Sequence, residues 1–239
     1  MISAFDTFKP HTFVDAFRFM ADNPGLMWQK TAEHLQISGE AMGIALLIAI
    51  PLGVWLGHIH RGSFISINLA NIGRALPSLA VVAVGLNVLG LSNLNVIVTL
   101  VILAVPPIIT NAYVAVDSVE PDAVDAARGM GMRPWQVLTK VELPLALPLI
   151  FAGLRTASVY VVGTSTIAGV AGVDGTLGDV IFNRPSYGIP GLIAAAMIIA
   201  VLALAIELGF AGLQKLVTPR GLRREEQPAA IGPAVGAST

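Results

Sequence analysis

Apolar residues dominate this chain, and its few charged side chains are gathered between long uncharged stretches. Asp, Glu, Lys and Arg are absent from residues 41–60, 75–116, 156–173 and 185–206. A helix needs about 20 apolar residues to cross about 30 Å of hydrocarbon, so the longest stretch must contain two crossings. The pattern therefore predicts an all-α, polytopic membrane protein with five transmembrane helices. We place them at residues 37–57, 65–89, 94–116, 145–171 and 191–216.

The segments that flank these helices have a different character. Residues 1–30 contain a predicted short amphipathic helix, in which Thr12 and Asp15 resemble a capping box. Because charged residues interrupt this helix, we expect it to lie on the outer membrane surface or to pack on a partner protein. Residues 31–217 form the transmembrane domain. Residues 218–239 are rich in Ala, Gly and Pro, and we expect a disordered cytoplasmic tail.

The composition excludes most other classes of protein. Only 12% of the 239 residues are charged and 55% are hydrophobic, whereas about 25% of a soluble domain is charged. So few charges cannot solvate a globular surface, and a net charge of -1 gives no basic surface for nucleic acid. The absence of cysteine excludes disulfides and thiolate metal ligands. Two imidazoles alone make a poor metal site, so we interpret His58 and His60 as loop residues.

The distribution of Lys and Arg predicts the orientation in the membrane. Of the basic residues near the ends of the predicted helices, eight fall on one side and four on the other. The eight are Arg61, Arg128, Arg133, Lys140, Lys215, Arg220, Arg223 and Arg224. The side with more basic residues is expected to face the cytoplasm. Five crossings then place the N-terminus outside the cell and the C-terminus in the cytoplasm.

The longest polar segment, residues 118–144, connects the third and fourth predicted helices and should itself form two short helices. Pro121 suits a first helical position, and the glycines that follow would end that helix. Gly131 is expected to be left-handed, a conformation in which a side chain costs about 1 kcal/mol. Pro134 can begin a second helix, which Leu143–Pro144 would end. Such a compact helical hairpin with small side chains suits docking against another protein.

This segment resembles the motif of a known family. The order Asp125-Ala126-Ala127, three residues, Gly131, nine residues and Val141-Glu142-Leu143-Pro144 is similar to the coupling loop of binding-protein-dependent ABC importer permeases. The family pattern is Glu-Ala-Ala, three residues, Gly, nine residues and Ile-x-Leu-Pro, so Asp125 and Val141 are conservative departures. We therefore call residues 118–144 the coupling loop. Its candidate coupling residues are Asp125, Ala126, Ala127, Gly129, Gly131, Val141, Leu143 and Pro144.

Two further stretches resemble the branch of this family that imports osmoprotectants such as glycine betaine, carnitine and choline. They are Arg74–Ala80, at the start of the second predicted helix, and Ala127–Met132, within the coupling loop. The resemblance covers most of residues 31–217. It implies a MetI-like importer permease fold and a translocation path for a small osmoprotectant.

The resemblance also implies a division of labour between subunits. The chain would be a transport subunit and not an enzyme, working with cytoplasmic ABC ATPase subunits, a second permease subunit that is identical or homologous, and an extracytoplasmic substrate-binding protein. ATP and magnesium would bind to the partner ATPase, with no cofactor or metal on this chain. The residues agree independently, because a P-loop needs Gly immediately before Lys and no lysine of this chain follows glycine.

Polar residues and prolines within the predicted helices are candidates for the translocation path. Those we select are Pro77, Ser78, Asn111, Thr164, Ser165 and Thr166. Ser and Thr also bond to the backbone of their own helix, which is the competing interpretation. Pro51, Pro77, Pro106 and Pro107 indicate either broken helices near the path or static kinks. Arg155 and Glu207 lie in the same half of the fourth and fifth helices, and we expect an intramembrane ion pair between them.

Other classes of membrane protein fit the sequence less well. A secondary transporter or channel should show acidic or histidine relays in mid-span or an internal repeat, and the sequence has neither. An intramembrane enzyme should show Ser with Lys, paired Asp or clustered His at catalytic spacing, and none of these arrangements occurs in the predicted helices. Another small zwitterion or amine is an alternative substrate, because the scattered Trp and Tyr form no obvious aromatic cage for a quaternary ammonium.

Overall fold

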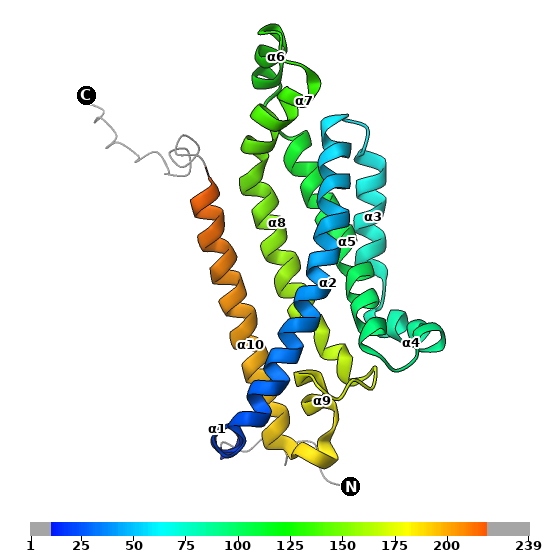
Figure 1. Cartoon of the computed structure of the whole chain (residues 1–239), viewed down its shortest axis with the longest axis vertical. Coiled ribbons are helices and arrows are strands. Elements are labelled where there is room, and N and C mark those ends of the chain that lie inside the picture. The colour runs from blue at the N-terminus through cyan, green and yellow to red at the C-terminus, as the bar shows by residue number, and fades with distance from the viewer. Residues whose placement is uncertain (1–10, 219–239) are drawn as a thin grey trace, which may run out of the picture.

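The computed structural model describes residues 11–218, and this part of the chain contains helices and no β-strand (Figure 1). The predicted all-α fold class is confirmed. The elements are α1 (His11–Asp22), α2 (Pro24–His58), α3 (Ser63–Ala75), α4 (Ser78–Leu89), α5 (Asn93–Asp117), α6 (Pro121–Gly129), α7 (Pro134–Val137), the π turn η2 (Leu138–Glu142), α8 (Leu143–Thr164), the 3-10 turn η3 (Ser165–Gly169), α9 (Leu177–Phe182) and α10 (Arg184–Val217). The predicted disordered tail lies outside the described residues, except for Thr218.

The long helices run roughly along one axis and give the molecule two distinct ends (Figure 1). At one end lie α6 and α7, which belong to the coupling loop; we call this the coupling-loop end. At the other lie α1 and α9; we call this the opposite end. Each residue of the coupling loop is therefore separated from α9 by most of the length of the bundle.

Four helical segments are long and apolar enough to cross a membrane. They are α2, α5, Pro134–Gly169 and α10. These segments contain the first, third and fifth predicted transmembrane helices, and the fourth except for its last two residues. Pro51 lies inside α2, and Pro106 and Pro107 lie inside α5, so none of these prolines ends its helix.

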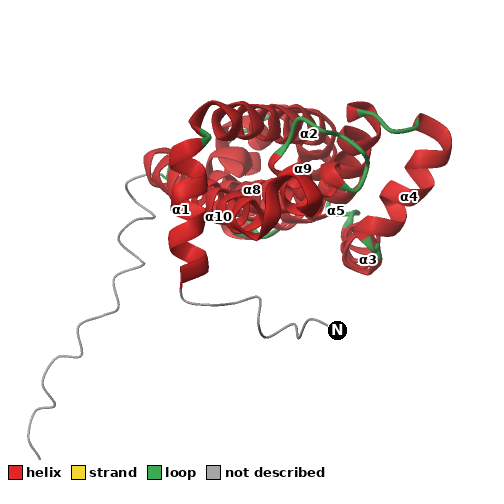
Figure 2. Cartoon of the chain, turned by 90° about the horizontal axis from the view of Figure 1, so that it is seen from below, coloured by secondary structure: helices red, strands yellow, loops and turns green. Residues whose placement is uncertain are grey.

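The second predicted transmembrane helix, residues 65–89, is not one continuous helix. It is divided into α3 and α4 at Leu76–Pro77, where both residues are extended. Proline lacks an N–H donor and its ring disfavours helical backbone at the preceding residue, so the helix ends there. Figures 1 and 2 show α4 turning away from the bundle after this break. Neither α3 nor α4 is long enough to span a membrane by itself. Residues 65–89 therefore do not form the single spanning helix that would bring the number of crossings to five.

The coupling loop contains the predicted first helix, α6, which starts at Pro121 and ends at Gly129. Gly131 has a φ of 81°, so its predicted left-handed conformation is confirmed. The second predicted helix does not end at Leu143–Pro144, because α7 continues through η2 into α8. In η2 the Leu143 N–H donates to the Leu138 carbonyl, five residues earlier. This wider turn accommodates Pro144, whose ring would clash with the carbonyl four residues earlier in a regular α-helix.

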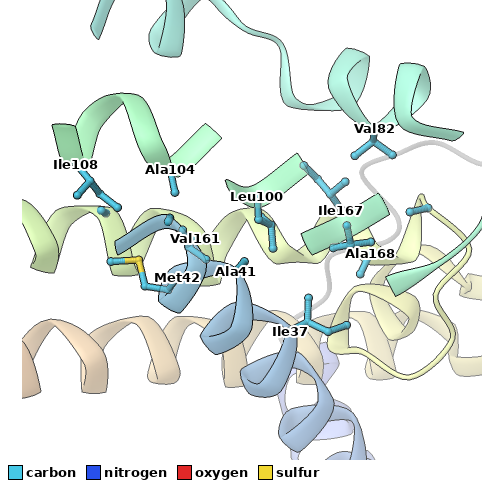
Figure 3. Close-up of a cluster of buried hydrophobic side chains, with 14 of the residues drawn as sticks. Ile37, Ala41, Met42, Val82, Leu100, Ala104, Ile108, Val161, Ile167 and Ala168 are labelled. Atoms are coloured by element: carbon cyan, nitrogen blue, oxygen red, sulfur yellow. The ribbon is translucent and has the colours of Figure 1, made fainter. Parts of the chain in front are cut away.

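The main hydrophobic core lies between α2, α5, α8 and η3 (Figure 3). Side chains from α2, including Ile37 and Ala41, face Leu100 and Ala104 of α5 and Val161 of α8. The backbones of α2 and α5 are close at Gly53 and Gly57. A Cβ atom at Gly53 would lie 2.6 Å from the Ala112 Cβ, and one at Gly57 would lie 2.7 Å from the Val116 Cβ. The coupling-loop end of α2 is therefore firmly packed on α5.

The predicted amphipathic helix near the N-terminus is present as α1, which ends just before Asn23. Its buried face packs on α10, where Ala16 contacts a small cluster with Ile193 and Ala194. Phe13 and Phe17 are exposed. The contact with α10 explains how this short helix is held, while its predicted place on the membrane surface stays a prediction.

Candidate functional site

The candidate coupling residues divide into an exposed set and a buried set. Asp125, Ala126, Gly129 and Gly131 are exposed at the surface of the coupling loop. Ala127 is 1% exposed and packs in a second hydrophobic cluster. The other members of that cluster are Ala115, Val116, Val119, Val124, Val137, Leu138, Ala146 and Ile150. Ala127 therefore holds the loop against α5 and α8, and the exposed surface of this part of the loop consists of its neighbours.

The tip of the coupling loop carries two large exposed apolar side chains. Met130 is 71% exposed and Trp135 is 69% exposed. Sequence analysis did not select them, although a tryptophan and a methionine in an otherwise polar loop were a usable signal. The Arg133 N–H donates to Gln136 Oε1 at 2.9 Å, which fixes the start of the helix that carries Trp135. Exposed aromatic and methionine side chains on a projecting loop are typical of protein interfaces.

The last part of the motif lies at the root of the coupling loop and is partly buried. Val141 and Leu143 pack against the second hydrophobic cluster, and Pro144 is half-buried. The residue between them, Glu142, is 1% exposed, and its Oε2 lies 2.6 Å from His58 Nδ1. This part of the motif therefore attaches the loop to the bundle.

The two histidines that sequence analysis interpreted as loop residues both have carboxylate partners. His58 is the last residue of α2, and it is half-buried beside Glu142. His60 lies in the turn after α2, where its Nδ1 is 2.7 Å from Asp117 Oδ1. Within residues 11–218, no cluster of three or more His, Cys, Asp or Glu side chains could hold a metal ion. His60 therefore lies in a loop as interpreted, whereas His58 is the last residue of α2. The carboxylate partners of both histidines were missed because they are distant in sequence.

Asn111 lies in a cavity of about 670 Å³ between α3, α5 and α8. Polar groups in its lining include Thr110, Thr156 and Tyr160. The Asn111 amide donates to the Pro107 carbonyl at 2.9 Å. The cavity thus combines a mainly small and apolar lining with a few polar groups, as expected for a weakly binding path.

Pro77 lines a neighbouring cavity of about 430 Å³ between α4 and α5, and Leu76 lines both cavities. Ser78 begins α4 next to Pro77 and is half-buried. Pro77 thus lines the neighbouring cavity at the break between α3 and α4, whereas Ser78 is not among the residues that line either cavity.

Thr164, Ser165 and Thr166 are not among the residues that line these two cavities. Ser165 is fully buried, 2.8 Å from His34 Nε2, and it accepts a hydrogen bond from Ser38 at 2.9 Å. This contact joins η3 to α2. The Thr166 hydroxyl donates to the carbonyl of Gly163, three residues earlier in the chain. The geometry favours a structural role for Ser165.

The predicted ion pair between Arg155 and Glu207 is present, with Arg155 Nε 3.2 Å from Glu207 Oε1. It connects α8 to α10, and both side chains are partly exposed. Arg155 also lines a cavity of about 780 Å³ near the coupling-loop end, together with Glu120 and Lys215. Arg155 therefore lies in the wall of a cavity between α5, α8 and α10, and its contact with Glu207 ties that wall to α10.

A buried ion pair at the opposite end was not predicted. Lys30 Nζ lies 2.5 Å from Asp179 Oδ2, and it also donates to the Asp174 carbonyl. The Tyr187 hydroxyl donates to the same Asp179 oxygen at 3.2 Å, and the Tyr187 ring lies 5.7 Å from Lys30 Nζ. Sequence analysis had treated Lys30 only as a charge beyond the end of a span. The pair fixes α9 against α2 and α10.

Four long apolar segments, mainly apolar cavities with a few polar groups and an exposed helical loop at one end have the organisation of a membrane permease. The chain belongs to the family of binding-protein-dependent transport system inner membrane components, whose model matches residues 49–221. The predicted class, a permease of an ABC importer, is therefore confirmed.

Three relatives illustrate the similarity. The chain is 37% identical over 210 residues to the glycine betaine/carnitine/choline transport system permease protein OpuCB of Bacillus subtilis, covering 86% of this chain and 94% of the relative. It is 36% identical over 212 residues to the choline transport system permease protein OpuBB of the same organism, covering 87% and 95%. It is 35% identical over 221 residues to the osmoprotectant import permease protein OsmW of Salmonella typhimurium, covering 88% and 100%.

Solved structures show the same fold. The inward-facing MetNI methionine ABC transporter contains a chain that aligns with a TM-score of 0.70 at 22% identity, covering 81% of this chain and 97% of that one. An amino acid ABC transporter with histidines aligns with a TM-score of 0.63 at 19% identity, covering 86% and 96%. The predicted MetI-like fold is confirmed.

Proposed function

We propose that this chain forms the translocation path of an ATP-driven importer for a small osmoprotectant such as glycine betaine, choline or carnitine. The observation that carries the proposal is the coupling loop, which presents the motif of importer permeases on a projecting hairpin with an apolar tip. The substrate class follows from the relatives named above, which are permeases for such compounds. An importer for another small zwitterion or amine is the second candidate, since few aromatic groups line the cavities.

The proposed partners follow from the family. Cytoplasmic ABC ATPase subunits dock on the coupling loop and bind ATP and magnesium, so this chain acts as a transport subunit. A second permease subunit, homologous or identical, completes the enclosure of the path. An extracytoplasmic substrate-binding protein delivers the substrate. In the proposed orientation the N-terminus lies outside and the coupling loop and C-terminus lie in the cytoplasm, in agreement with the excess of Lys and Arg on that side.

The proposed path passes the cavity beside Asn111. A transported solute must enter and leave, so the path should bind it weakly. Small side chains with a few hydroxyl and amide groups meet that need. Pro77 borders the neighbouring cavity at the break between α3 and α4, with Ser78 next to it in the chain. The interrupted helix there offers a place for the path to change shape.

The exposed tip of the coupling loop allows a direct test of ATPase docking. Removing an aromatic anchor from an interface typically costs about 2 kcal/mol or more, which is roughly 30-fold in affinity. We therefore expect Trp135→Ala to release the ATPase subunits during purification of a tagged permease. Ala126→Arg, which adds a long charged group at an exposed position, should do the same without disturbing the buried cluster around Ala127.

The matched control is Trp28→Ala, which deletes the same side chain from a similarly exposed position at the opposite end. It should retain the ATPase. The docking proposal fails if Trp135→Ala and Ala126→Arg retain the ATPase as fully as the wild type does. The substrate proposal is tested separately, by uptake of labelled glycine betaine, choline and carnitine in cells that lack and then regain the transporter. No uptake of any of the three would favour another zwitterion or amine.

A further inference from the structure

The end of α2 and the turn after it contact both roots of the coupling loop, which are the places where the loop joins α5 and α8. Asp117 is the last residue of α5 and immediately precedes the loop, and Glu142 is the last residue of η2, where the loop joins α8. His60 contacts Asp117 and His58 contacts Glu142. Two histidines separated by one residue thus contact two carboxylates, one at each root of the loop.

The contact at Glu142 is the more enclosed of the two. The side chains of His58 and Glu142 are 11% and 1% exposed, whereas those of His60 and Asp117 are 49% and 35% exposed. Among residues 11–218, the other carboxylate oxygen of Glu142 has no hydrogen-bond partner. An ionised Glu142 carboxylate can only accept a hydrogen bond, and the His58 tautomer with its proton on Nδ1 supplies the matching donor. His58 is therefore the principal group that compensates the buried Glu142.

The base of this arrangement is firmly packed. A Cβ atom at Gly62 would lie 2.9 Å from the Tyr113 ring, so the turn after α2 lies directly on α5. The Tyr113 hydroxyl donates to Asp117 Oδ2 at 3.0 Å, which orients the carboxylate toward His60. His60 has a φ of 51°, a left-handed conformation that is uncommon outside glycine but is one that histidine tolerates better than most residues.

The π turn lies next to the Glu142 contact. Because η2 has wider backbone bonding than the α-helix that follows, a change of register at this point can move the loop relative to α8. The loop already contacts α2 through apolar side chains, because Ile50 and Val54 pack against its hydrophobic cluster. The His58 contact adds a directional polar link between Glu142 and α2, which packs on α5 in the main core.

We infer that His58 and His60 are positioning residues that clamp both roots of the coupling loop to α2, so that movement of the loop is carried into the spanning helices. His58 is the stronger half of the clamp because its contact is buried. This inference rests on the proposed function, in which the ATPase moves the loop.

The test compares transport with ATP hydrolysis in the complete complex of permease, ATPase and binding protein, reconstituted in lipid vesicles with labelled glycine betaine. In His58→Leu, ATPase subunits remain bound and hydrolysis continues, while transport per ATP falls by about tenfold, within the range of measured coupling energies. His58→Asn, whose amide can donate from a position near Nδ1, restores most of the ratio. His60→Leu lowers the ratio by about twofold, because its contact is exposed to water.

His11→Leu, at an exposed histidine of α1, is the control and should leave the ratio unchanged. An unchanged ratio in His58→Leu overturns the clamp, and so does a parallel loss of hydrolysis and transport that His58→Asn does not reverse. If His58→Leu does not assemble, His58→Asn and His58→Gln decide the question. The longer Gln side chain carries its amide past the Nδ1 position, so equal ratios for these two variants overturn the clamp.

A second measurement is independent of the substrate and so separates failure of the clamp from failure of the proposed function. The chain has no native cysteine, so a variant with Arg128→Cys on the loop and Leu47→Cys on α2 carries spin labels at these two positions and nowhere else on the chain. The distribution of distances between the two spin labels should be narrow when His58 is present and broad in the His58→Leu variant. Equal widths overturn the clamp, whatever compound the complex transports.

Discussion

The two ends of the bundle both contain a carboxylate held by α2, but the groups that hold them differ. At the opposite end, Lys30 and Asp179 are 2.5 Å apart and each side chain is 8% exposed. At the coupling-loop end, His58 and Glu142 are 2.6 Å apart. Asp179 accepts additional hydrogen bonds, including one from Tyr187, whereas one oxygen of Glu142 lacks a partner among residues 11–218.

The difference indicates which end is the fixed attachment. Separating a buried lysine from its carboxylate leaves two uncompensated charges, which is strongly unfavourable. A histidine can donate its hydrogen bond in the neutral or the charged form, so its separation from a carboxylate costs less. The Lys30–Asp179 pair at the opposite end is therefore the more rigid polar attachment of α2, and the His58–Glu142 pair is the polar attachment that can adjust.

The largest expected effect lies at the opposite end. Lys30→Met leaves Asp179 buried without its cation and should lower the free energy of unfolding by about 3–5 kcal/mol. Thermal unfolding of the purified permease complex in detergent measures this. The double variant Lys30→Met with Asp179→Leu removes both charges and should recover most of the loss. If Lys30→Met unfolds at the wild-type temperature, the opposite end is not the rigid attachment.

The next effect tests the packing of α9 at the same end. A Cβ atom at Gly178 would overlap the Thr166 carbonyl, a backbone group that cannot rotate away. Gly178→Ala should therefore destabilise the protein by about 1–3 kcal/mol. Gly163→Ala is the control, since no atom lies within 4 Å of its added Cβ. Similar unfolding temperatures for both variants would show that α9 can shift, contrary to a fixed attachment.

At the coupling-loop end we expect a smaller effect from two neighbouring glycines. Gly131→Ala places a side chain at a φ of 81° and should destabilise the loop by about 1 kcal/mol. Gly129→Ala lies in α6 with open space around the added Cβ, and alanine favours the helix by about 1 kcal/mol. Hydrogen exchange of the loop amides should become faster in the first variant and slower in the second. Equal changes in both would contradict the left-handed turn.

The smallest effect is expected at the surface of α6. Asp125 lies 3.7 Å from Arg128 in an exposed pair. Asp125→Asn should change the free energy of unfolding by less than about 0.5 kcal/mol, because exposed pairs are screened by water. Chemical denaturation of the complex tests this. A larger loss would mean that the coupling loop depends on surface charge more than on its buried cluster.

The sequence alone determined the elements that depend on local properties. Long uncharged stretches predicted four of the spanning segments, because hydrocarbon excludes charge over a fixed length. Pro121 marked the start of α6, and Gly131 marked a left-handed turn, because these residues restrict or free their own backbone. The motif frame from Asp125 to Pro144 identified the coupling loop before any contact was known.

Only the tertiary structure decided which distant residues meet. His58 and Glu142 are 84 residues apart, and Lys30 and Asp179 are 149 apart. These pairs form because helix packing sets the rotation and height of each helix, which hydrophobic periodicity in one segment does not specify. For the same reason the sequence could not show that Ala127 faces inward while Ala126 faces outward. Pro77 was noticed as an interruption, but whether a proline bends a helix or ends it depends on the neighbours that receive the freed carbonyls.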